Sequence, residues 1–335
     1  MSHPLAPSGW RATESPFHSA ELAVQERVGV RARMDIDARR GIRDYMPEQH
    51  RNFFSGLPFM LLGGLDATGQ PWASMRIGAA GFVSSPDERT LRIAGHSPSG
   101  DPLTGIWGVG DIVGGLGIEP WTRRRNRVNG SITAMENDAM TITVSQSFGN
   151  CAKYIQSRSP NSANHDLTDA NTVSIADRLS QADRDLLRRA DTLFIASANS
   201  SAEAGLARGA DVSHRGGKPG FVRIDDDRTL TMPDFSGNHF FNTIGNLVND
   251  PRTGLLLIDF DSGDVLYIAA DAEIIWEGPE VDAFAGAERL VRFHLREVRR
   301  SRGAMPFRWS TVEYAPQLAR TGNWPIPAGP VQAAT

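Results

Sequence analysis

The chain has 335 residues, which is long enough for two domains, and its composition is that of a globular protein, with 40% hydrophobic and 22% charged residues. A formal net charge of −4 argues against a dedicated nucleic-acid-binding protein, which usually carries a basic face. The single cysteine, Cys151, excludes an intrachain disulfide and a cysteine-only metal cluster. The sequence contains no run of about 18 apolar residues that would indicate a membrane span, and its first residues lack the pattern of a secretory signal. We therefore expect a cytoplasmic protein that binds neither nucleic acid nor a membrane.

The hydrophobic patterning divides the chain into five segments. Residues 1–50 have helical spacing and are predicted to form an N-terminal arm. Residues 51–156 and 179–315 are predicted to form two β-rich halves, joined by a polar linker without periodicity at 157–178. Residues 316–335 are rich in proline and alanine and are predicted to be a loose tail.

Strand-like apolar runs recur in both halves. They lie at 57–66, 90–95, 111–119 and 140–146 in the first half, and at 192–197, 220–224, 229–233, 253–260 and 264–278 in the second. Ser180 with Asp183 three residues later predicts a helix start with an acidic capping box. A further helix is expected between 229–233 and 253–260.

The two halves share an internal repeat. Residues 74–91 align without a gap on 213–230, at an offset of 139, and ten of the eighteen positions are identical. Residues 112–119 resemble 252–259 at an offset of 140. The chain is therefore predicted to contain two copies of one β-rich unit.

The second copy of the repeat gathers residues suited to a phosphate. Ser213, Arg215 and Lys218 combine a hydroxyl and two cations with glycines that allow a ligand to approach the backbone. A hairpin with a solvated basic turn is an equally good interpretation of this segment alone.

The helix that follows offers a second element of the same site. Asn238 is a favourable N-cap, and a helix N-terminus attracts anions through its free N–H groups. Thr243 and Asn246 are three residues apart on this helix, so they share a face that could meet a ligand or the sheet. Asn238 could also simply cap the helix.

Three features of the first half remain open. The basic run 123–127 is either a solvated surface or a phosphate patch. Lys153 lies in a polar segment after a strand, and Cys151 beside it is predicted to be a small buried residue, since no histidine partner is evident. Arg76, the repeat partner of Arg215, is predicted to belong to a degenerate site.

Residues 213–260 resemble the FMN-binding core of the pyridoxamine 5′-phosphate oxidase-like split-barrel family, and the resemblance extends over about 17–315. It implies an α+β, mainly β fold of two tandem split β-barrel domains with short peripheral helices, usually assembled as a homodimer. The cofactor-binding residues that it implies are Ser213, Arg215, Lys218, Met232, Pro233, Asn238, Thr243 and Asn246. One departure is that the family's Ser-Arg-Lys cluster near the helix start is replaced by Phe241-Asn242-Thr243.

The resemblance implies an FMN-dependent oxidoreductase that acts on a small molecule, with NAD(P)H or a separate reductase as electron donor. The alternatives are a non-catalytic flavin or haem carrier or sensor, and a protein that binds the deazaflavin F420. No metal site is expected, because the sequence has no HExxH motif and no zinc-like His/Cys spacing. The substrate-binding Arg–His pair of the oxidase itself is not evident, so vitamin B6 oxidation is not expected.

Overall fold

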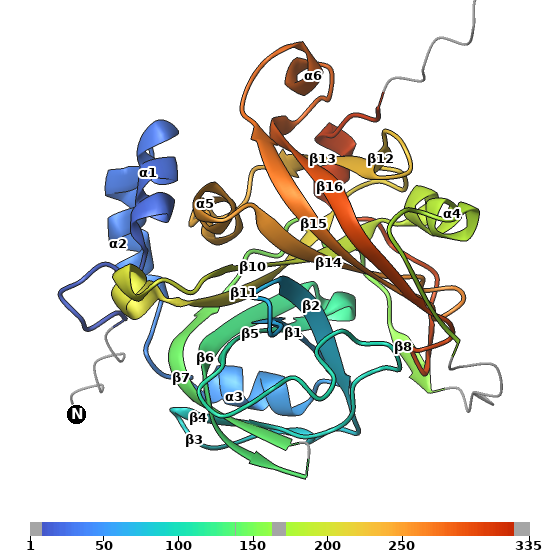
Figure 1. Ribbon diagram of the computed structural model, residues 1–335. Coiled ribbons are helices and arrows are strands. Elements are labelled where there is room, and N and C mark those ends of the chain that lie inside the picture. Colours follow the sequence, from blue (N-terminus) through green and yellow to red (C-terminus); the bar gives the residue numbers. More distant parts are fainter. Residues whose placement is uncertain (1–8, 138, 163–171, 325–335) are drawn as a thin grey trace, which may run out of the picture.

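The computed structural model describes residues 9–137, 139–162 and 172–324, and this part of the chain is mainly β with short helices at its periphery (Figure 1). The linker positions 163–171 and the tail positions 325–335 lie outside the described residues. None of the described helices is long and apolar enough to span a membrane.

The first half is a seven-stranded antiparallel sheet with the order β2-β1-β5-β6-β7-β4-β3. Its strands are β1 (Phe59–Leu65), β2 (Pro71–Ile77), β3 (Val83–Asp87), β4 (Thr90–Ile93), β5 (Ile112–Glu119), β6 (Arg124–Glu136) and β7 (Ala139–Gly149). This sheet curves around α3 (Glu48–Ser55), whose Phe53 and Phe54 are buried against it (Figure 1).

The second half has the order β11-β10-β14-β15-β16-β13-β12, which is the same connectivity as the first. Its strands are β10 (Thr192–Asn199), β11 (Gly209–Gly216), β12 (Arg223–Ile224), β13 (Thr229–Phe235), β14 (Arg252–Ile258), β15 (Val265–Ile275) and β16 (Ala287–Ser301). A short strand from the predicted linker, β9 (Val173–Ala176), pairs with the end of β16.

The remaining elements lie around these sheets. The small strands β8 (Pro160–Ser162) and β17 (Phe307–Trp309) pair with each other. The α-helices besides α3 are α1 (Ser19–Arg27), α2 (Arg31–Gly41), α4 (Gln181–Arg189), α5 (Asn242–Asn249) and α6 (Pro279–Asp282), and the 3₁₀ turns are η1 (Pro120–Thr122), η2 (Ala202–Ala207) and η3 (Pro316–Arg320). The predicted capping box of α4 is confirmed, because Ser180 and Asp183 exchange side-chain-to-backbone hydrogen bonds.

The registers of the two sheets also correspond. Gly114 on β5 faces Asn129 on β6, and 140 positions later Gly254 on β14 faces Ala269 on β15. Because pairing register fixes which side chains face the core, the repeat in the sequence is matched by a repeat in the arrangement of side chains.

Glycines allow the two halves to pack closely at equivalent places. A Cβ on Gly114 would lie 2.2 Å from the carbonyl oxygen of Ala210, and a Cβ on Gly254 would lie 2.5 Å from that of Pro71. Pro71 and Ala210 are equivalent positions of the repeat, at the starts of β2 and β11. Each half therefore uses the same surface to contact the other, as the two subunits of a two-fold symmetric dimer do. Figure 1 shows β10, β11 and β14 lying next to β1, β2 and β5 at this junction.

Candidate functional site

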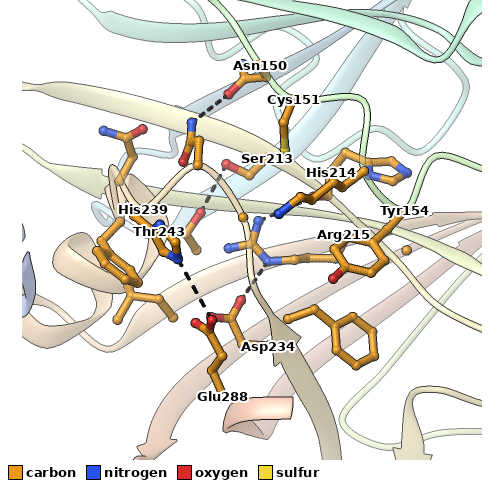
Figure 2. Close-up of a pocket in the computed structure, with 18 of the residues that line it drawn as sticks. Asn150, Cys151, Tyr154, Ser213, His214, Arg215, Asp234, His239, Thr243 and Glu288 are labelled. Carbon is orange, nitrogen blue, oxygen red and sulfur yellow. Dashed lines mark hydrogen bonds and ion pairs between the residues drawn. The ribbon is translucent and has the colours of Figure 1, made fainter. Parts of the chain in front are cut away.

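A cleft opens where the two halves meet, and Figure 2 shows the residues around it. The empty space among its lining residues is about 860 Å³, a volume that includes open solvent. The first half supplies β6 and residues 150–154 after β7, and the second half supplies β11, β13, the start of α5 and β16. We refer to it as the interhalf cleft.

The structure brings five of the eight predicted cofactor-binding residues to this cleft. They are Ser213, Arg215, Pro233, Asn238 and Thr243. The two segments that carry them are in direct contact, because the Thr243 hydroxyl donates a hydrogen bond of 3.0 Å to the Ser213 Oγ (Figure 2). The sequence-based expectation that the basic strand and the following helix lie together is therefore met in space, although cofactor binding itself stays a prediction.

Three of the predicted residues do not line the cleft. Lys218 lies in the turn after β11, and its ammonium donates to the Thr321 carbonyl at 2.7 Å. The Met232 side chain is fully buried in the core of the second half, because alternate residues of a strand point to opposite faces and Pro233 takes the cleft side. Asn246 is one helical turn deeper, where its amide donates to Ser197 Oγ and Asp211 Oδ2, both at 3.1 Å.

The start of α5 differs from the prediction. The N-cap is Phe241 rather than Asn238, with a left-handed φ of 62° and no side-chain capping bond. Asn238 instead uses its Oδ1 to accept the Phe240 N–H at 3.1 Å, and this local bond ends before the helix begins. His239 also has a left-handed φ of 61°, so two strained residues precede the helix. The first turn of α5 is left without a side-chain cap at the edge of the cleft.

The cleft contains more positive than negative charge. Asp234 is shared between two arginines: its Oδ1 lies 3.3 Å from Arg215 Nε and its Oδ2 lies 2.6 Å from Arg289 Nη1. Arg125 and Lys153 also line the cleft, yet among the described residues no carboxylate lies within 4.0 Å of either cation.

Arg125 and Lys153 are held by backbone atoms instead. Arg125 donates to the Cys151 carbonyl at 2.8 Å and to the His214 carbonyl at 3.3 Å, and Lys153 donates to the Ser236 carbonyl at 3.4 Å. Burial lowers the pKa of Arg125 from its usual value, because a guanidinium without a nearby anion is poorly solvated there. A bound anion would offset the cost of that desolvation through its attraction for the guanidinium.

Arg127 connects the two halves at the back of the cleft. It is 3% exposed, forms an ion pair with Asp211, and donates to Ser213 Oγ and to the Val212 carbonyl, the last at 3.1 Å. Breaking a buried pair of this kind by removing one partner is strongly destabilising, so Arg127 is as much a structural connection as a site residue.

Other residues of the cleft lining are aromatic or acidic. Tyr154 stacks on Phe235 with ring centroids 5.0 Å apart, and His239 lies 3.8 Å from Glu288. Burial, together with Arg125 and Arg215, lowers the pKa of His214 well below its ordinary value, so this imidazole is neutral at pH 7.

The basic run 123–127 is now resolved residue by residue. Arg125 and Arg127 are two apart on β6 and both face the cleft, whereas Arg124 lies over the Phe53 ring at 4.6 Å and Arg123 pairs with Glu313 at 2.9 Å. The period-2 alternation of β6 separates Arg124 from Arg125 and Arg127, whereas Arg123 precedes this strand and has a left-handed φ of 53° at the end of η1.

Other cleft residues were not anticipated. Cys151, predicted to be buried, is half-buried and lines the cleft, with its sulfur 3.5 Å from Arg125 Nη2. Asp234, Glu288 and Arg289 also lie here, and no sequence signal indicated them because they come from separate strands whose pairing only the fold reveals.

No protein-family model and no curated protein matches the chain. Among solved structures, the chain is similar to a putative pyridoxamine 5′-phosphate oxidase from Lactobacillus delbrueckii, at 13% identity over 37% of this chain and 94% of that chain, with a TM-score of 0.30. It is also similar to an F420 reductase (15% identity, 37% and 98% covered, TM-score 0.25) and to an FMN-binding protein from Syntrophomonas wolfei (16% identity, 35% and 88% covered, TM-score 0.24). Each of these likenesses spans little more than a third of the chain, at a low score.

Proposed function

We propose that the interhalf cleft binds the phosphate of FMN and that the chain is an FMN-dependent oxidoreductase built from two split-barrel units. The observation that carries the proposal is a pair of cations, Arg125 and Lys153, which have no carboxylate partner within the described part of the chain and lie beside the uncapped start of α5. Cations, hydroxyls and the N-terminus of a helix are the groups that bind phosphate in proteins.

Unpaired polar atoms around the cleft fit such a ligand. Five buried side-chain nitrogens of lining residues have no hydrogen-bond partner among the described residues: Arg127 Nε, Asn150 Nδ2, His214 Nδ1, Arg215 Nε and Arg289 Nε. Buried donors are normally satisfied, so several orphans in one place indicate a missing polar partner.

The lining also divides by chemistry in the way that a flavin requires. Arg125, Lys153 and Arg215 would hold the phosphate, while Tyr154 and Phe235 supply apolar surface suited to a planar ring. A bound flavin supplies hydride and electron transfer, and the chain's residues position it and exclude water.

The binding test compares FMN with riboflavin, which lacks the phosphate. Titration of the purified protein, followed by flavin fluorescence, is expected to show FMN binding at least about 10-fold more tightly, the value of one charge-assisted hydrogen bond of about 1.5 kcal/mol. F420 is titrated in parallel. Equal affinities for FMN and riboflavin, or no binding of any of the three, would overturn the proposal.

The redox test uses the FMN-loaded protein mixed anaerobically with NADH or NADPH. Bleaching of the flavin absorbance at a catalytic rate supports an oxidoreductase. Stable FMN binding with no reduction by either nicotinamide or by a reductase would instead identify a non-catalytic flavin carrier or sensor.

A further inference from the structure

The duplication of the chain creates a second place equivalent to the interhalf cleft. In the cleft, Ser213 and Arg215 on β11 lie near Arg125 and Arg127 on β6 of the other half. The repeat places Ser74 and Arg76 on β2 at the positions of Ser213 and Arg215, and β15 of the second half is the counterpart of β6.

The strand registers identify the counterparts of the two β6 arginines. Arg125 faces Ile118 and Arg127 faces Leu116 across β5 and β6. The positions 140 residues later pair in the same way, since Val265 faces Ile258 and Tyr267 faces Leu256 across β14 and β15. Where one copy has two cations, the other therefore has Val265 and Tyr267, both fully buried in the core.

A carboxylate of the chain itself already occupies the second place. Asp101 is 5% exposed, and its Oδ2 accepts hydrogen bonds from the Ser74 hydroxyl at 2.7 Å and from the Met75 N–H at 3.2 Å. Its Oδ1 accepts from the Leu103 N–H at 2.9 Å. These donors, including the repeat partner of Ser213, are thus satisfied internally, and a second anion would be repelled by Asp101.

We infer that the interhalf cleft binds an anion and that the equivalent second place does not. The cleft has the cations Arg125 and Arg127, whereas the second place has Val265 and Tyr267 at the corresponding positions and the carboxylate of Asp101 beside them. The inference rests on the proposed function only for the identity of the ligand that carries the anion. On this inference the duplicated chain has one cofactor site rather than two.

The experiment locates an anion directly. Crystals of the full chain are soaked in tungstate, whose anomalous scattering marks its position without requiring a flavin. We expect one ordered tungstate within hydrogen-bond distance of Arg125 or Lys153, and none within that distance of Ser74. A tungstate at Ser74, or none in the interhalf cleft, would overturn the inference.

A titration in solution separates this inference from the proposed function. One FMN per chain is expected, with Arg125→Gln lowering the affinity at least about 10-fold and Arg76→Gln, its binding measured on protein shown to be folded by circular dichroism, leaving it within about 2-fold. Two FMN per chain would overturn the inference. Tungstate in the cleft of a protein that binds no flavin would refute the proposed function while leaving the asymmetry supported.

Discussion

Substituting Gly114 by alanine should separate the two halves slightly and weaken everything that depends on their contact. The added Cβ would lie 2.2 Å from the Ala210 carbonyl oxygen, whereas ordinary contact begins near 3.4 Å, so about 1 Å of movement is needed. Both sides of this contact are backbone, and no side chain can rotate away. Overpacking of a core lowers the free energy of unfolding by about 1–3 kcal/mol, and for a rigid contact we expect a loss at the upper end, about 3 kcal/mol.

Thermal unfolding measures this effect. At about 2 °C per kcal/mol for a chain of this size, we expect a Tm about 6 °C below that of the wild type. FMN affinity should also fall, because the Arg125 bond to the His214 carbonyl, 3.3 Å long, crosses the same junction. Gly209→Ala is the matched control, since a Cβ there has no heavy atom within 4 Å. If the two variants melt at the same temperature, Gly114 is not a packing contact between the halves and the reasoning is wrong.

Three further predictions follow from individual side chains. Arg125→Gln should weaken FMN binding by about 10- to 100-fold in a fluorescence titration, because a charge-assisted hydrogen bond contributes about 1.5–3 kcal/mol. Arg123→Gln should not, because Arg123 lies outside the cleft lining and bonds to Glu313 and to the Ile155 carbonyl; equal effects would contradict the assignment. The two lysines form a second matched pair. Lys153→Met should lower FMN affinity about 5-fold, while Lys218→Met, outside the cleft, should change the affinity less than 2-fold. A larger effect of Lys218→Met would instead favour Lys218, the lysine chosen from the sequence. Burial raises the pKa of Glu21 to about 8 from 4.5, so the folded state holds a proton that the unfolded state loses. The free energy of unfolding should therefore fall as the pH rises from about 5 to 8. Glu21→Gln should flatten this pH dependence, measured by urea unfolding, and an unchanged dependence would show that Glu21 does not titrate in this range.

The sequence was informative where local rules act. Alternating apolar runs predict strands such as β5 and β14, and the 139-residue repeat predicts that the two halves have a common architecture. The segment around Arg215 was singled out because an arginine, a serine and several glycines together suit an anion, and in the structure Ser213 and Arg215 line the cleft.

The sequence was uninformative where tertiary contacts decide. Arg289 reaches Asp234 across neighbouring strands, and no periodicity records which strands pair. Asn238 has the residue type of an N-cap, but a left-handed Phe241 delays the helix by three residues. Lys218 belongs to the same basic segment as Arg215, and the turn simply carries it toward Thr321.

Fusion of two copies into one chain explains how the asymmetry can exist. In a symmetric dimer of identical subunits, any substitution appears in both sites, so a change that fills one site also destroys the other. In this chain the positions of Arg125 and Arg127 are free to differ from those of Val265 and Tyr267. The apolar pair then joins the core that spans the junction, together with Phe194, and fixes the two halves against each other. A rigid junction is what the remaining cleft requires, because Arg125 and Lys153 come from one half and the start of α5 from the other.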